Sequence, residues 1–239
     1  MSKIDFSFVG EDVLGAGRES RLISGFSIID LSSELCQSSE ETPGDSGYSD
    51  PISKICEISD WVTTQVKPYC VKKITMSAHA VTHLDAPLHV IENGATTDGV
   101  AQDLIGKCIV IDVIDDALKI AYFRSRALNI VPKKTIVVIR GKRDARIDEE
   151  LRNKIIAAEP KAVVFGDCVN TTGVEDSQAY LKEGIPMIMD AVNLDKLRDD
   201  DVIFALPIKI KAVEAAPVRL FALRFTDDAD GTNGDGLLL

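Results

Sequence analysis

Short runs of apolar residues, rich in β-branched side chains and bounded by turn-forming residues, recur along the chain and predict strands. Apolar residues at helical spacing separate some of these runs, and they predict helices. We expect strands at residues 26–31, 71–76, 108–114, 135–140, 162–165, 186–189, 202–210 and 217–225. We expect helices at residues 148–158, 177–182 and 194–198. Strands outnumber helices and alternate with them only in the second half, which predicts a mixed α/β domain rather than a strict βαβ series.

The punctuation of the chain indicates one domain over residues 1–239, with an N-terminal extension at 1–25. Turn-forming residues are dense at 38–51 and predict a surface loop. The tail at 226–239 is rich in Asp and Gly and is expected to fray. With 45% hydrophobic residues the chain can bury a substantial core without disulfides or a structural metal. A bound metal would therefore serve chemistry.

The charge and the cysteine content of the chain limit which classes of partner and which cellular compartment we expect. Lys and Arg total 27 against 38 Asp and Glu, so the net charge of -11 disfavours binding to nucleic acid or to anionic membranes. No leader and no apolar run near the roughly 20 residues of a membrane span are visible. An odd number of cysteines without a C-x-x-C pair suggests free thiols in a reducing cytoplasm. The five are Cys36, Cys56, Cys70, Cys108 and Cys168.

All three histidines fall within eleven residues, in the segment His79-Ala-Val-Thr-His83-Leu-Asp85-Ala-Pro-Leu-His89. Imidazole and carboxylate are the ligands that Zn²⁺ and Mn²⁺ select, so this cluster predicts a metal site, with a purely structural cluster as the alternative. In a straight strand His79 and His83 would stand roughly 13 Å apart, which is too far for one ion. The chain must therefore fold back between them. His83 and Asp85 can then converge in a locally extended segment.

The segment resembles the H-x-G-T-H-x-D-x-P-x-H signature of the cyclase family, which includes bacterial kynurenine formamidase and isatin hydrolase. It departs from the signature at Val81, where the family has glycine; because a β-branched residue resists positive φ, we expect the turn to be made differently here. The resemblance covers roughly residues 28–223. It includes Ile29-Asp-Leu-Ser, Thr42-Pro-Gly-Asp, Val138-Ile-Arg-Gly and Ala216-Pro-Val-Arg219.

The resemblance implies a swivelling β/β/α fold with a mixed or barrel-like β core and flanking helices, assembled as a homodimer or homotetramer. It also implies that His79, His83 and Asp85 hold a divalent ion, with His89 as the proton-transfer group. Relatives with two zinc ions supply a further His and Glu, whose positions correspond to Gln178 and Asp190. Gln is a weak donor and Asp is shorter than Glu, so one firmly bound Mn²⁺ or Zn²⁺ is expected and a second ion would be held weakly.

An ion held by two neutral imidazoles and a carboxylate can polarise a carbonyl and lower the pKa of a bound water. We therefore expect a metal-dependent hydrolase acting on a small amide, formamide, lactam or lactone, with His89 moving the proton. A cyclase or lyase that stabilises an enolate is one alternative, and a catalytically idle metal-binding relative is another. For Asp190, capping a helix or facing solvent is an alternative to metal contact. Arg219 and Trp61 are expected to serve structure, through an ion pair and through packing, rather than substrate binding.

Overall fold

The computed structural model describes residues 25–36, 56–113, 134–141, 147, 149–166 and 174–226, with the backbone alone at 174–177 and 226. The expected loop at 38–51 lies outside these residues. The expected N-terminal extension and C-terminal tail also lie outside them, apart from residues 25 and 226, which are strand ends.

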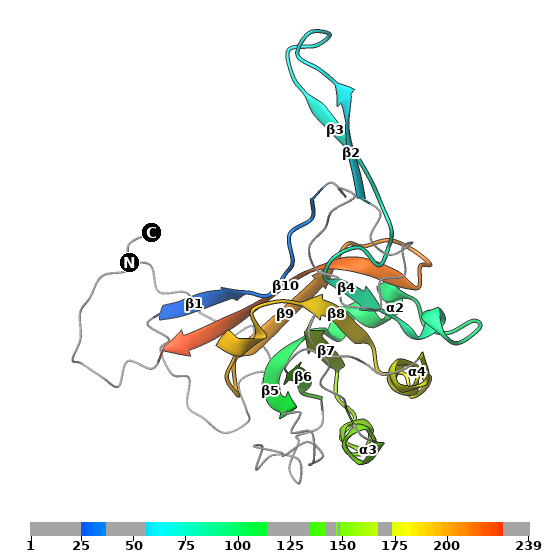
Figure 1. Cartoon of the computed structure of the whole chain (residues 1–239), viewed down its shortest axis with the longest axis vertical. Coiled ribbons are helices and arrows are strands. Elements are labelled where there is room, and N and C mark those ends of the chain that lie inside the picture. Colours follow the sequence, from blue (N-terminus) through cyan, green and yellow to red (C-terminus); the bar gives the residue numbers. More distant parts are fainter. Residues whose placement is uncertain are drawn as a thin grey trace, which may run out of the picture.

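Eight strands of the described chain form one mixed sheet. They are β1 Gly25–Asp30, β4 His83–Asp85, β5 Ile105–Val113, β6 Ile136–Gly141, β7 Ala162–Gly166, β8 Met187–Ala191, β9 Val202–Pro207 and β10 Ala215–Thr226. Seven of them close a barrel in the order β10, β4, β8, β7, β6, β5 and β9, because β9 pairs again with β10 (Figure 1). β1 pairs with the C-terminal half of β10.

Alternate residues of the barrel strands face two apolar cores. Strands β5 to β8 run parallel to one another, and in β6 Ile136 and Val138 pack inside the barrel. Val137 and Ile139 point the other way and pack against two helices, α3 Glu149–Ala157 and α4 Val174–Lys182 (Figure 1). Strands buried on both faces require nearly continuous apolar sequence, which is why the pattern alone revealed them.

The predicted mixed α/β fold, with a barrel-like core and flanking helices, is confirmed. Some boundaries differ: α4 begins earlier than predicted, at Val174, and β9 ends at Pro207. The segment predicted as a helix at 194–198 is a 3₁₀ turn. The short helical elements are η1 Pro87–His89, α2 Thr97–Val100, η2 Ala101–Asp103 and η3 Leu194–Lys196.

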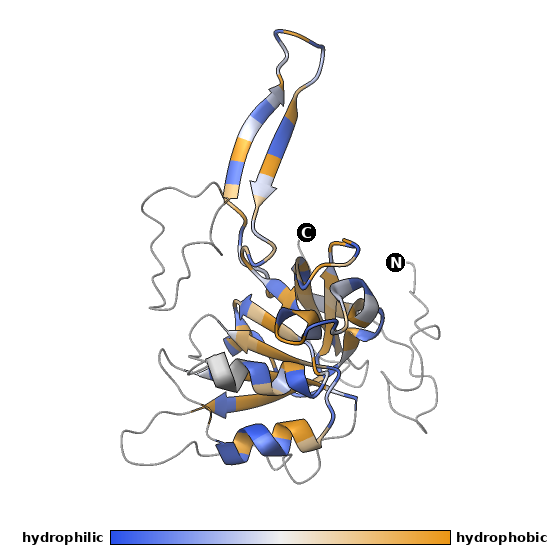
Figure 2. Cartoon of the chain, turned by 90° about the vertical axis from the view of Figure 1, so that its right-hand side faces the viewer, coloured by the Kyte–Doolittle hydropathy of each residue, from blue (hydrophilic) through white to orange (hydrophobic). Residues whose placement is uncertain are grey.

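One hairpin, which we call the arm, stands away from the barrel (Figures 1 and 2). It consists of β2 Cys56–Val62, which was not predicted, and β3 Val71–Met76. Among the described residues these two strands pair only with each other. Trp61 lies on the arm with 67% of its surface exposed. Within a single copy of the chain, the expectation that it serves packing is therefore wrong.

Across the described ranges, no helix has both the length and the apolar character that a membrane crossing requires.

Candidate metal centre

The histidine segment begins with a tight turn that reverses the chain before β4. Val81 adopts a positive φ of 54° in this turn, so the expectation that a valine would force a different turn is wrong. The next residue, Thr82, is buried, and its hydroxyl donates to the carbonyl of Asp190 at 2.9 Å. The same hydroxyl oxygen accepts the backbone N–H of Ser33 at 2.8 Å. These bonds hold a backbone conformation that a β-branched residue disfavours.

Strand β4 then fixes the direction of the next side chains. It lies between β10 and β8, and His83 and Asp85 face the opposite side from Leu84, which packs inside the barrel. The backbone N–H of Ala86 donates to the carbonyl of Glu214 at 2.8 Å, and η1 follows with His89 as its last residue. The predicted fold-back and the predicted extended segment at His83 and Asp85 are both confirmed.

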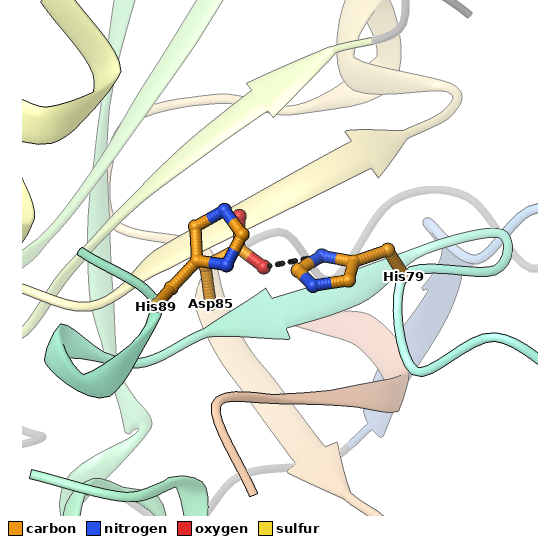
Figure 3. A group of neighbouring side chains, drawn as sticks. All are labelled: His79, Asp85 and His89. Atoms are coloured by element: carbon orange, nitrogen blue, oxygen red, sulfur yellow. Dashed lines mark ion pairs between the residues drawn. The ribbon is translucent and has the colours of Figure 1, made fainter. Parts of the chain in front are cut away.

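The turn, the strand and the 3₁₀ helix bring three imidazoles around one carboxylate. Asp85 Oδ1 lies 3.0 Å from His79 Nδ1 and 3.5 Å from His83 Nε2. The potential ligand atoms of His79, Asp85 and His89 all lie within 4.8 Å of one another (Figure 3). The ring centroid of His79 is 5.0 Å from that of His83 and 4.6 Å from that of His89. Either His83 or His89 is therefore placed to act as the third donor beside His79 and Asp85.

The donor set fits a divalent ion. Two atoms each about 2.1 Å from one ion are about 3.0 Å apart at an octahedral angle and about 3.4 Å at a tetrahedral one. The two measured distances around Asp85 Oδ1 have this size. That oxygen is buried, and despite its short distance to His79 no donor among the described residues has hydrogen-bonding geometry toward it. Burying a carboxylate oxygen without such a donor costs folding free energy, and a bound cation would remove that penalty.

The electrostatics of the cluster favour a charged imidazole beside a charged carboxylate. Pairing with Asp85 raises the pKa of His79 above its ordinary value, against an opposing effect of burial. Burial alone would raise the pKa of Asp85, but the pairing with His79 and the neighbouring imidazoles hold it below its ordinary value. Asp85 is therefore an ionised carboxylate at neutral pH, the form that binds metal.

Exposure differs among the histidines. His83 is buried, His79 is one-fifth exposed at its side chain, and His89 lies on the solvent side of the cluster. A solvent-facing imidazole can exchange protons with water, whereas buried donors suit a permanent coordination shell.

The two positions considered for a second ion differ in their placement. Asp190 sits in β8 with a φ of 56°, and its Oδ2 lies 3.9 Å from His83 Nδ1. It is part of the strand rather than a helix cap, and about half of its side chain is exposed. Gln178 lies half-buried in α4, and no bond in the described chain joins it to the cluster.

The structure adds one acid that the sequence did not reveal. Glu214 directly precedes β10, and its Oε1 lies 3.5 Å from His79 Nε2. It is distant in sequence from the histidines, and only the pairing of Ala215 with Asp85 brings it beside them. Arg219, in contrast, pairs with both carboxylate oxygens of Asp30, at 2.5 and 2.9 Å. This is the structural ion pair that was expected for it.

The closed barrel, with the histidine cluster on and beside β4, defines the class of the protein: a β-barrel domain with a candidate divalent-metal centre. The sequence gives the family, because residues 29–195 match the model of the family named Cyclase. The chain therefore belongs to the cyclase family of metal-dependent hydrolases.

The similarity to relatives extends over nearly the whole length of each relative. The chain is 27% identical over 207 residues to a kynurenine formamidase of Delftia acidovorans, covering 80% of this chain and 94% of that one. It is 28% identical over 210 residues to a kynurenine formamidase of Polaromonas naphthalenivorans, covering 80% and 88%. The solved structure of isatin hydrolase A from Ralstonia solanacearum shares the fold, with a TM-score of 0.63, 15% identity, and coverage of 83% of this chain and 92% of that one.

Proposed function

We propose that the protein is a divalent-metal-dependent hydrolase that cleaves the C–N bond of a small amide, formamide or lactam, or the related bond of a lactone. The observation that carries the proposal is the buried Oδ1 of Asp85, which lies beside two imidazoles and has no hydrogen-bond donor in the described part of the chain. Relatives named kynurenine formamidase and isatin hydrolase support the same bond class.

In this proposal His79, Asp85 and His83 hold one Mn²⁺ or Zn²⁺, and a second ion, near Asp190, is bound weakly. The bound ion would polarise a carbonyl and lower the pKa of a water. His89 takes a proton from the attacking water and returns it to the leaving nitrogen, because it lies beside His79 on the exposed side of the cluster. The ionised carboxylate of Asp85 keeps the cluster attractive to a cation.

We also propose that a second copy of this chain covers the arm, giving a homodimer or homotetramer. A two-stranded hairpin is marginally stable alone in water, yet this one exposes Trp61, Tyr69 and Ile74. Every copy exposes the same apolar residues on its arm, so two arms can pair symmetrically. A cytoplasmic location, suggested by the cysteine content, belongs to the same proposal.

Elemental analysis followed by a substrate screen tests the function. Protein purified without chelator should carry about one Mn²⁺ or Zn²⁺ per chain, and it should hydrolyse a member of a panel of N-formyl aromatics, isatin-like lactams and cyclic imides. The His83→Ala variant should lose both properties. Reaction in ¹⁸O-labelled water should place label in the product acid, whereas an unlabelled product would indicate a lyase. Metal well below one ion per chain would contradict the proposal.

A further inference from the structure

We infer that Glu214 is a positioning residue for the metal centre. Its carboxylate accepts the Nε2–H of His79, and this contact presents Nδ1 of the ring to the ion. The inference rests on the proposed metal-dependent function. It assigns a role to a residue outside the histidine segment, directly before β10, the strand that closes the barrel.

The two nitrogens of His79 have different neighbours. Nδ1 lies 3.0 Å from Asp85 Oδ1, inside the cluster of potential ligand atoms. Nε2 lies 3.5 Å from Glu214 Oε1. A neutral imidazole carries one proton. When Nδ1 binds a cation, that proton must be on Nε2, where the carboxylate of Glu214 can accept it. That tautomer leaves the lone pair of Nδ1 directed to the cluster.

Glu214 does not share the ion with Asp85. The nitrogens of one imidazole point away from each other, so a carboxylate at Nε2 cannot also reach an ion bound at Nδ1. Its side chain is 40% exposed, against 10% for Asp85, which places it on the outer side of the ring. Metal-binding histidines commonly donate their second N–H to a carboxylate, which fixes the ring and raises its basicity as a ligand.

The backbone holds Glu214 at this position independently of its side chain. Its carbonyl accepts the N–H of Ala86, and the carbonyl of Val213 accepts the N–H of Thr97. Ala215 pairs with Asp85 in the register of β10 and β4. The strand that directly follows the acid is thus paired to the strand that carries the proposed ligand Asp85. Replacing the side chain removes the contact with His79 and leaves these backbone bonds in place.

Metal affinity is the decisive measurement. Titration calorimetry of the metal-free full chain with Zn²⁺ should show binding about 10- to 100-fold weaker in Glu214→Ala than in wild type. Glu214→Gln, which keeps an acceptor oxygen but no charge, should fall between them. Glu149→Gln, at an exposed acid on α3, is the matched control and should bind like wild type. Thermal unfolding of each metal-free variant checks that all four proteins fold.

A spectroscopic readout separates positioning from general stability. The chain has only three histidines, so long-range ¹H–¹⁵N correlation spectra of the Zn²⁺-loaded protein can be assigned with single His variants. His79 should carry its hydrogen on Nε2 and bind through Nδ1. Equal affinity of Glu214→Ala and wild type, or a ring bound through Nε2, would overturn the inference while leaving the proposed function standing. A wild-type protein that binds no Zn²⁺ or Mn²⁺ would overturn both.

Discussion

The Nδ1 atom of His83 lies 2.8 Å from the carbonyl oxygen of Val81, two residues earlier in the turn. A carbonyl can only accept, so Nδ1 must carry the hydrogen and Nε2 keeps its lone pair. Nε2 is the nitrogen that faces Asp85 Oδ1 at 3.5 Å. The strained turn therefore sets the tautomer of a proposed metal ligand as well as reversing the chain.

Replacing Val81 with Gly should be tolerated. A β-branched residue at a φ of 54° is strained by about 1–2 kcal/mol, and Gly removes this strain. The greater entropy of the unfolded chain with Gly opposes this gain by roughly 0.4–1 kcal/mol. We expect the free energy of unfolding to stay within about 1 kcal/mol of wild type, as measured by urea denaturation. Val100→Gly is the control, because Val100 is also partly buried but has a φ of −93°. That variant should lose clearly more stability, and equal losses would show that Val81 is not strained.

Much of the barrel could be predicted because its strands are buried on both faces. The segment 136–139 reads Ile-Val-Val-Ile, without a polar residue until Arg140, and such runs have few other stable solutions. The arm strand at Cys56–Val62 was missed because its exposure removes that pressure, so polar and apolar residues mix along it. Barrel closure was beyond the pattern as well, since it depends on β10 pairing with both β4 and β9.

Removing the charge of Asp85 should abolish metal binding. Asp85→Asn keeps the shape of the side chain but places a neutral amide where a cation would face an ionised carboxylate. We expect the affinity for Mn²⁺ or Zn²⁺ to fall at least 100-fold by calorimetry, with hydrolysis lost in parallel. The exposed Asp200→Asn variant, whose wild-type side chain pairs with Lys107, should bind metal normally. Retained affinity in Asp85→Asn would remove this residue from the proposed ligand set.

The site was predictable only where its residues are close in sequence. Eleven residues hold all three histidines and Asp85, and ligand spacing alone required the fold-back that the structure shows. Val81 was misjudged because the bonds of Thr82 to Ser33 and Asp190 cannot be seen in a local pattern. Glu214 was missed for the same reason, since it reaches His79 through strand pairing 135 residues along the chain.

The thiol of Cys108 should make stability fall at alkaline pH. Burial, and secondarily the nearby Asp201, raises its pKa to about 12. Below the ordinary thiol pKa both states are protonated and nothing is lost; above it the unfolded chain releases its proton first, so stability declines until the folded thiol also titrates. Between pH 8 and pH 10 we expect about 1–2 kcal/mol of loss in urea unfolding that the Cys108→Ala variant lacks. Equal slopes would show that the thiol is not protected.

A charge on the arm should weaken the proposed assembly. Trp61→Arg places a cation on the exposed apolar surface that a second copy is proposed to cover. The dissociation constant should rise by about 30-fold or more, as for a central aromatic contact, in analytical ultracentrifugation. Trp61→Phe keeps an apolar ring and should remain assembled. A wild-type chain that sediments as a monomer at every concentration would contradict the proposal.

The roles of His83 and His89 can be separated by measuring metal content and turnover in the same preparations. His83 is buried and its Nε2 faces Asp85, whereas His89 lies at the exposed side of the cluster. We therefore expect His83→Ala to lose its metal. His89→Ala should keep about one ion per chain while its kcat falls by roughly 10²-fold or more, because the proton must then pass through solvent. The opposite pattern is also compatible with the ligand-atom distances among His79, Asp85 and His89. If His89→Ala loses metal and His83→Ala retains it, His89 is the third ligand, and the proton-transfer role must be assigned to another group.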